Sequence, residues 1–241
     1  MSITPAQKYA VDCIVSIFET GRIPTAAAYA TCTILPDGAG ISYGKHQCTD
    51  KAGSLDAVVK RYIELGGQHA AAFRGMLPYF ASNKSTTEPP KGPWSAETNA
   101  AVNLLKQAAA DPLMHRAQDD VFDQHYWAPA VNACASMGLK SALAHAVIYD
   151  TCIHSGPGMV TNMRNRFAAV PPAKGGDEKE FIKQYCQARE TWLASSSNEL
   201  VRRTVYRMDA FQALIAEGNW DLRLPLAVRG VVIPVPHAAA V

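Results

Sequence analysis

The chain has 241 residues, with 23 Lys and Arg against 21 Asp and Glu, which gives a formal charge of +2. Its hydrophobic share of 48% is too high for a disordered chain and is enough for a full core. The near-balanced charge argues against a dedicated nucleic-acid-binding protein, which needs a basic stripe, and against a site built for a polycation. A mildly basic protein, with a pI of about 8.2, is instead compatible with a polyanionic partner such as the cell wall.

The sequence also limits targeting and cofactors. We find no apolar run of roughly 18 residues and therefore expect no membrane span. The first residues lack a basic region and a continuous apolar region, which predicts cytoplasmic synthesis without a secretory signal. The six cysteines have no metal-like spacing, so we expect no metal site, no cofactor and reduced thiols. One or two disulfides remain the alternative outside the cytosol.

The N-terminal third begins with clear start and stop signals for a helix. Thr4 is a suitable N-cap, apolar residues then recur at three- and four-residue spacing, and Gly21 ends the pattern. Segments 28–35 and 41–43 are rich in β-formers and flank a Pro-Asp-Gly turn, which predicts a short β-hairpin.

The remaining elements are mostly helical. Helices are expected at 55–65, 95–110, 112–136, 138–152, 158–168, 178–196 and 198–217, with a β-like tail at 224–233. The polar, Pro-rich stretch 82–93 is the predicted boundary between two lobes. We therefore expect a single, mainly α (α+β) catalytic domain with a minor lobe at 25–82, a major lobe at 1–24 and 94–222, and a tail at 223–241.

Two acidic residues stand in contrasting surroundings. Glu19 lies at the end of the first helix, where the negative end of the dipole and apolar neighbours such as Phe18 should raise its pKa. Asp37 lies in a Gly-rich turn open to water and should stay ionised. One acid and one base are what hydrolysis of a glycosidic bond requires. The alternatives are a solvated glutamate and an aspartate that serves the turn.

Four ordered blocks resemble glycoside hydrolase family 46, which comprises chitosanases and related wall-cleaving enzymes of the lysozyme superfamily. The blocks are Phe18-Glu19 with Leu35–Gly44, Tyr149–Gly158, Gly175–Arg189 and Arg207–Leu222. The resemblance implies a lysozyme-like fold with a small β-sheet in the minor lobe and an active-site cleft between the lobes.

The resemblance also implies roles for matched residues. Glu19 would be the general acid and Asp37 the general base in an inverting reaction, while Ser42 takes the place of a hydroxyl residue that helps to hold the attacking water. Asp150, Arg189 and Arg207 resemble a buried charge network that positions the catalytic glutamate. The alternative for these three is a purely structural salt-bridge network.

This chain departs from the family chitosanases at two positions. They carry an arginine where Ala39 stands, and an acidic residue that reads the free amine of the sugar where Ser54 stands closest. Asp50 could replace that acid, although its spacing differs. A cleft without this anion loses its recognition of glucosamine.

The segment Tyr43-Gly44-Lys45-His46-Gln47 instead resembles peptidoglycan-cleaving relatives found in phage lysins and type VI secretion effectors. We therefore predict that the substrate-binding residues are Tyr43, Lys45, His46, Gln47 and His154. The alternatives are a solvated hairpin end and, for the last residue, a hydrogen-bonding role at a helix end.

These observations favour an enzyme that hydrolyses the glycan backbone of peptidoglycan, as a muramidase does, after export or lysis brings it to the wall. The first alternative is an endo-chitosanase that cleaves β-1,4-linked glucosamine polymers. The second is a non-catalytic wall-binding module. We expect a monomer with a polysaccharide substrate, no nucleic-acid partner and, as accompanying proteins, an immunity protein or a holin.

Overall fold

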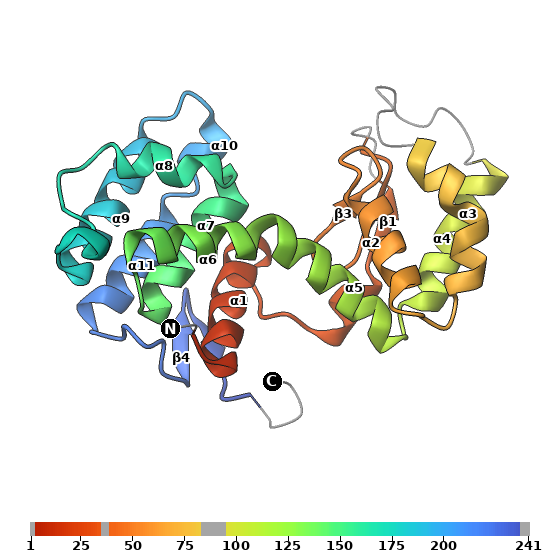
Figure 1. The fold of residues 1–241 in the computed structure, drawn as a ribbon, viewed down its shortest axis with the longest axis horizontal. Helices are drawn as coiled ribbons and strands as arrows, with labels where there is room; N and C mark the ends of the chain where they lie inside the picture. Colours follow the sequence, from red (N-terminus) through yellow and green to blue (C-terminus); the bar gives the residue numbers. More distant parts are fainter. Residues whose placement is uncertain (1–2, 35–38, 83–94, 237–241) are drawn as a thin grey trace. The chain divides into compact units, whose positions relative to one another are not determined.

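The computed structural model describes residues 3–34, 39–82 and 95–236. The chain forms two compact units, one from Met1–Pro24 with Tyr126–Val241 and one from Thr25–His125. Helices dominate both units (Figure 1), which agrees with the predicted mainly α class. Asp37 lies outside the described residues.

The unit of residues 25–125 contains the predicted hairpin. A 3₁₀ turn, η1 (Ala26–Ala30), leads into β1 (Cys32–Ile34), which pairs antiparallel with β2 (Ile41–Tyr43). The described residues add a third antiparallel strand, β3 (Cys48–Thr49), which is not among the predicted strands. In this register Thr33 is opposite Ser42, so Ser42 lies in the middle of the central strand.

Four helices complete this unit: α2 (Ser54–Glu64), α3 (Ala70–Ser82), α4 (Ala96–Ala108) and α5 (Pro112–Phe122). Helix α3, which carries Pro78 in its interior, is not among the predicted helices. Helices α4 and α5 belong to this unit, so their predicted place in the larger lobe is wrong. The apolar faces of both helices are buried in one cluster with α2, α3 and the sheet, so their burial ties them to this unit.

The base of the hairpin is held by one buried amide on α5. The Gln118 side chain is fully buried. Its Oε1 accepts a hydrogen bond from the Lys45 N–H at 3.1 Å, and its Nε2 donates to the Tyr29 carbonyl at 3.1 Å. Gly44 lies against this amide with φ +78°, and a Cβ there would be 2.0 Å from Gln118 Oε1. The position therefore requires glycine for both space and conformation.

The other unit begins with α1 (Pro5–Thr20), whose predicted cap is confirmed. The Thr4 hydroxyl accepts from the Gln7 N–H, and the Gln7 side chain accepts from the Thr4 N–H, which makes a capping box. Further along the chain are α6 (Ala128–Met137), α7 (Ala142–Ser155), α8 (Gly158–Arg164), the 3₁₀ turn η4 (Pro172–Lys174), α9 (Glu178–Ala194), α10 (Glu199–Arg202) and α11 (Tyr206–Ala216).

The predicted helix 112–136 is interrupted. It divides into α5 and α6 at a π-helical turn, η3 (Asp123–Trp127), which ends two residues before Pro129. Proline has no N–H to donate within a helix, so a local change in hydrogen bonding at this point is expected. The C-terminal tail forms a hairpin of β4 (Leu226–Val228) and β5 (Val231–Ile233), as its β-like pattern predicts.

Helix α7 is the core of its unit. Every residue from Ala142 to Cys152 is buried, and α7 packs against α1, α6, α8, α9 and α11. A helix that is buried on all sides needs hydrogen-bond or ionic partners for its polar side chains. Asp150 is one of these buried polar side chains.

The structure also gives the state of the cysteines and the character of the helices. The six cysteines all lie in the described ranges and are free thiols. Among the helices described, none is both long and apolar enough to cross a membrane.

The buried amide of Gln118 yields a stability prediction. Gln118→Met keeps the shape but leaves the Lys45 N–H and the Tyr29 carbonyl without partners, which should lower the free energy of unfolding by about 2 kcal/mol. The matched control is Gln107→Met, at an exposed position of α4. Urea unfolding of the three proteins measures the difference. Equal destabilisation by both substitutions would contradict the role assigned to Gln118.

Candidate active site

Glu19 is held at the end of α1 by interactions of its neighbours. The helix stops at Gly21, which has φ +75° and donates its N–H to the Ile17 carbonyl. The Phe18 carbonyl accepts a 2.7 Å hydrogen bond from the Tyr206 hydroxyl, and the Phe18 ring is buried edge-on against Phe211. The backbone on both sides of Glu19 is therefore fixed while its side chain points away from the core.

Arg207 on α11 joins Glu19 to the buried carboxylate of α7. Its Nη2 donates to Glu19 Oε1 at 2.7 Å, and its Nη1 donates to Asp150 Oδ1 at 2.7 Å. Burial alone would lower the pKa of Arg207, but the negative charges of Asp150 and Glu19 hold it above its usual range. One guanidinium fork thus binds two carboxylates at once.

Arg189 on α9 extends this network on the other side of Asp150. Its side chain is fully buried, and its Nη2 lies 3.9 Å from Asp150 Oδ2. The same nitrogen lies 3.3 Å from His154 Nδ1. Burial and the charges of Arg207 and Arg189 lower the pKa of His154 to about 4. Because a guanidinium can only donate, His154 Nδ1 is the acceptor and the imidazole proton is on Nε2.

The structure therefore brings together two carboxyl groups and two guanidinium groups, those of Glu19, Asp150, Arg189 and Arg207. The Glu19 carboxyl group is more exposed than expected from its apolar neighbours in the sequence. The Glu19 side chain is 43% exposed and ion-paired, whereas the Arg207 side chain is 3% exposed. The apolar residues beside Glu19 in the sequence face the core and do not cover its carboxyl group. No described residue donates to Glu19 Oε2, so this oxygen can exchange a proton with a bound molecule.

The hairpin carries the other predicted site residues. Ser42 is 5% exposed, and its hydroxyl donates to Gln47 Oε1 at 3.0 Å. Gln47 is exposed, and its Nε2 donates to the Gly44 carbonyl. Tyr43 cannot bind substrate as predicted. Its side chain is completely buried, and its hydroxyl donates to the Leu105 carbonyl at 3.0 Å, because the residue belongs to the core beneath the sheet.

Lys45 and His46 bind a carboxylate of their own unit. Lys45 Nζ and His46 Nε2 lie 3.1 and 2.9 Å from Asp119 Oδ1, and the Tyr29 hydroxyl donates to Asp119 Oδ2 at 2.7 Å. The imidazole of His46 stacks on Phe122 with 3.7 Å between ring centroids. Burial alone would raise the pKa of Asp119, but the bond from His46 and the charge of Lys45 hold it well below its usual range. These contacts give both side chains a role in fixing the hairpin end, and substrate binding by them stays a prediction.

Asp50 contacts the first residue of β2, the strand that follows the predicted catalytic turn. It is 3% exposed, and its Oδ2 accepts from the Ile41 N–H at 2.9 Å. Burial raises the pKa of Asp50 to about 6, although the bond from Ile41 opposes this shift. Its buried position prevents Asp50 from reading a sugar amine at the surface. Ser54 is only half-buried, and its hydroxyl accepts from the Thr49 N–H at 2.9 Å.

Two residues that shape the hairpin, Gln118 and Asp119 of α5, are not among the predicted site residues. Both lie 73 or more residues from one of their partners, so no local pattern could reveal them. Within the described ranges, no three His, Cys, Asp or Glu side chains gather in a way that could hold a metal ion.

Comparison with known proteins identifies the family. Residues 13–226 match the model of glycosyl hydrolase family 46. A chitosanase of Bacillus subtilis (strain 168) is 28% identical over 235 residues, with 92% of this chain and 82% of that protein covered. A chitosanase of Streptomyces sp. (strain N174) is 27% identical, with coverage of 88% and 75%.

Solved structures match almost the whole chain. A chitosanase of Gynuella sunshinyii in complex with chitotetraose matches with a TM-score of 0.75 and 25% identity, covering 98% of this chain and 100% of that one. A mutant chitosanase of Bacillus subtilis MY002 complexed with 6 GlcN matches with a TM-score of 0.73 and 25% identity, with the same coverage. These matches confirm the predicted fold class. The chain belongs to glycoside hydrolase family 46 and is a glycosidase.

Proposed function

We propose that this glycosidase is an endo-chitosanase that hydrolyses β-1,4-linked glucosamine polymers. The observation that carries the proposal is the set of relatives. The curated relatives are chitosanases, and solved structures that match almost the whole chain hold chitosan oligosaccharides. The comparisons favour this substrate over the peptidoglycan glycan that the sequence analysis placed first.

The geometry of the hairpin also weakens the case for peptidoglycan. Part of that case was the prediction that Lys45 and His46 contact the substrate, and Asp119 binds Lys45 Nζ and His46 Nε2. An accompanying immunity protein or holin stays a prediction.

In the proposed reaction Glu19 is the general acid. Arg207 holds Glu19 Oε1, which fixes the carboxyl group and leaves Oε2 to donate a proton to the glycosidic oxygen. Asp37 is the general base that activates water, with inversion at the anomeric carbon. Ser42, which is near this turn in sequence, helps to hold that water. These roles rest on the family resemblance together with the contacts of Glu19.

The proposal predicts the effect of a neutral isostere at the acid. Glu19→Gln cannot donate a proton, so hydrolysis of soluble chitosan should fall by about 10³-fold or more while the melting temperature changes little. Glu217→Gln, at an exposed position beyond the end of α11, is the matched control and should keep parental activity.

The release of reducing ends from chitosan and from purified peptidoglycan sacculi measures these rates. Undiminished chitosan hydrolysis by Glu19→Gln would contradict the role of Glu19. Rapid cleavage of sacculi by a parent protein that leaves chitosan intact would overturn the proposed substrate.

A second prediction concerns the missing anion at Ser54. Ser54→Asp adds a carboxylate at the first residue of α2, where the helix dipole favours negative charge. The new charge should attract the glucosamine ammonium and lower KM for chitosan several-fold, a gain of about 1 kcal/mol. Ser54→Asn has a similar shape without the charge and should leave KM unchanged. Equal KM values for the two variants would show that this position does not contact the amine.

A further inference from the structure

The hairpin of β4 and β5 belongs to the unit that carries Glu19, and β5 packs against α1. Arg229 and Gly230 join its strands, with φ values of +50° and +79°. Positive φ at both residues of a two-residue loop is the pattern of a type I′ turn, which favours Asn, Asp or Gly at its first position. A longer side chain is strained at positive φ. The backbone therefore gives no reason for an arginine at position 229.

The side chain of Arg229 supplies a reason. The carbon of its guanidinium group lies 3.6 Å from the centre of the Tyr206 ring, which is a close cation–π contact. Arg229 is exposed and Tyr206 is half-buried. The contact therefore places a charged group from the hairpin turn against the first residue of α11.

Tyr206 in turn holds the end of α1. Its hydroxyl donates to the Phe18 carbonyl at 2.7 Å, across 188 positions of sequence. The Phe18 carbonyl is one of the last four of the helix, which lack the N–H partners that a continuing helix would provide. The two rings also meet, with 6.1 Å between their centroids and 66° between their planes. Tyr206 thus caps the last turn of α1.

Consecutive residues of α11 hold consecutive residues of α1. Tyr206 binds the Phe18 carbonyl, and Arg207 Nη2 donates to Glu19 Oε1 at 2.7 Å. Arg207 therefore fixes the carboxyl group of Glu19, while Tyr206 fixes the backbone from which that side chain extends. A shift of the Tyr206 ring would move the Glu19 backbone and, with it, Oε2.

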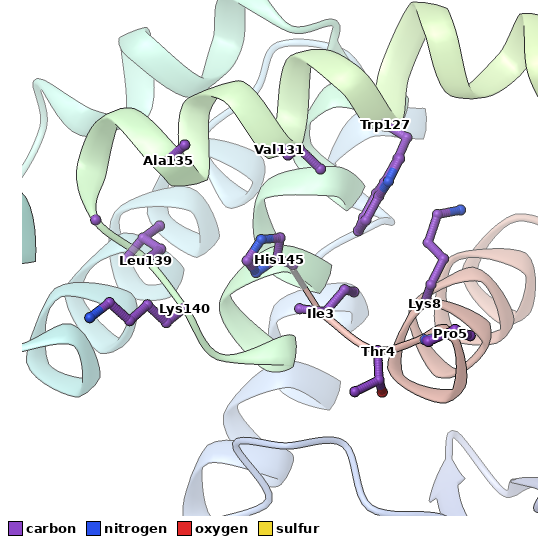
Figure 2. A pocket seen from close by; sticks show the side chains of 11 residues that line it. Ile3, Thr4, Pro5, Lys8, Trp127, Val131, Ala135, Leu139, Lys140 and His145 are labelled. Carbon is purple, nitrogen blue, oxygen red and sulfur yellow. The ribbon is translucent and has the colours of Figure 1, made fainter. Parts of the chain in front are cut away.

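The beginning of α1 is held by separate contacts. The Lys8 ammonium lies 4.6 Å from the centre of the Trp127 indole and binds both carboxylate oxygens of Asp12 (Figure 2 shows the lysine and the indole). Because an α-helix rises 1.5 Å per residue, Lys8 and Phe18 are about 15 Å apart along the axis. A change at Tyr206 should therefore act on the last turn of α1 and leave the rest of the helix in place.

We propose that Arg229 and Tyr206 are positioning residues for the reaction of Glu19. Arg229 holds the Tyr206 ring, and the Tyr206 hydroxyl fixes the backbone of α1 beside Glu19. The inference rests on the proposed role of Glu19 as the general acid. A misplacement of about 1 Å can slow a reaction by about 10²-fold, so loss of this support should lower kcat more than it changes KM.

Arg229→Asn separates positioning from stability. Asn-Gly is a preferred pair for a type I′ turn, so the hairpin gains a better turn while it loses the contact with Tyr206. The melting temperature should stay close to that of the parent, and kcat for chitosan should fall about fivefold. Arg223→Asn is the matched control, because it removes the same charge from an exposed position of the same C-terminal segment. It should keep the parental kcat and show the same KM as Arg229→Asn.

Tyr206→Phe keeps the ring beneath Arg229 but removes the donor to Phe18, and kcat should fall about tenfold. Tyr62→Phe is its control in the other unit, where the lost hydroxyl donates to Asp111 at 2.6 Å. This control should lower the melting temperature without lowering kcat. Because Arg229 acts through Tyr206, the double variant should be no slower than Tyr206→Phe alone.

A second readout needs no substrate. The ¹³C resonance of the Phe18 carbonyl should shift in Tyr206→Phe and, to a smaller extent in the same direction, in Arg229→Asn. An unchanged Phe18 resonance in Arg229→Asn would overturn the proposal, as would parental kcat in either variant. Arg229→Asn decides the matter if Tyr206→Phe does not fold. A parent that cleaves sacculi but not chitosan would overturn the proposed substrate only, and kcat on sacculi would then test the positioning role.

Discussion

The site depends on one guanidinium group, which must neutralise a buried carboxylate and hold an exposed one. Asp150 is completely buried in the central helix α7, where an unpaired charge would cost several kcal/mol. Arg207 meets that requirement with one nitrogen and binds Glu19 with another. The Arg207 side chain that compensates the buried charge of α7 therefore also fixes the Glu19 carboxyl group at the end of α1. A structural salt bridge and a positioning role are thus two consequences of one geometry.

In the unit of residues 25–125, side chains of one helix hold the short strands in place. Its short strands have little surface of their own, and α5 holds them through Gln118 and Asp119. The first binds the backbone of the hairpin base, and the second binds Lys45 and His46. Residues that differ from the chitosanase pattern thus serve the hairpin itself.

The sequence could predict what is locally encoded. Thr4 and Gly21 bound α1 because their capping groups act within a few residues, and the hairpin follows from its turn. The meeting of Asp150 and Arg207 was predicted only from the family resemblance, since no periodicity joins residues 57 positions apart. Long-range contacts also explain the failures. Tyr43 is buried through a contact with Leu105 of α4, 62 residues away in the sequence, which no local motif reveals. Helix α4 itself was assigned to the wrong lobe because its apolar face does not identify its partner.

A double-mutant cycle tests most directly whether Arg207 acts on the reaction through Glu19. Arg207→Lys keeps a positive charge beside Asp150 but cannot bind two carboxylates with one planar fork. The measured quantity is kcat/KM for chitosan in the parent, Arg207→Lys, Glu19→Gln and the double variant, with melting temperatures to confirm folding. The account predicts that the double variant is about as slow as Glu19→Gln alone, because the two residues act as a unit. Losses that multiply would show that Arg207 contributes independently of Glu19 and would contradict the account.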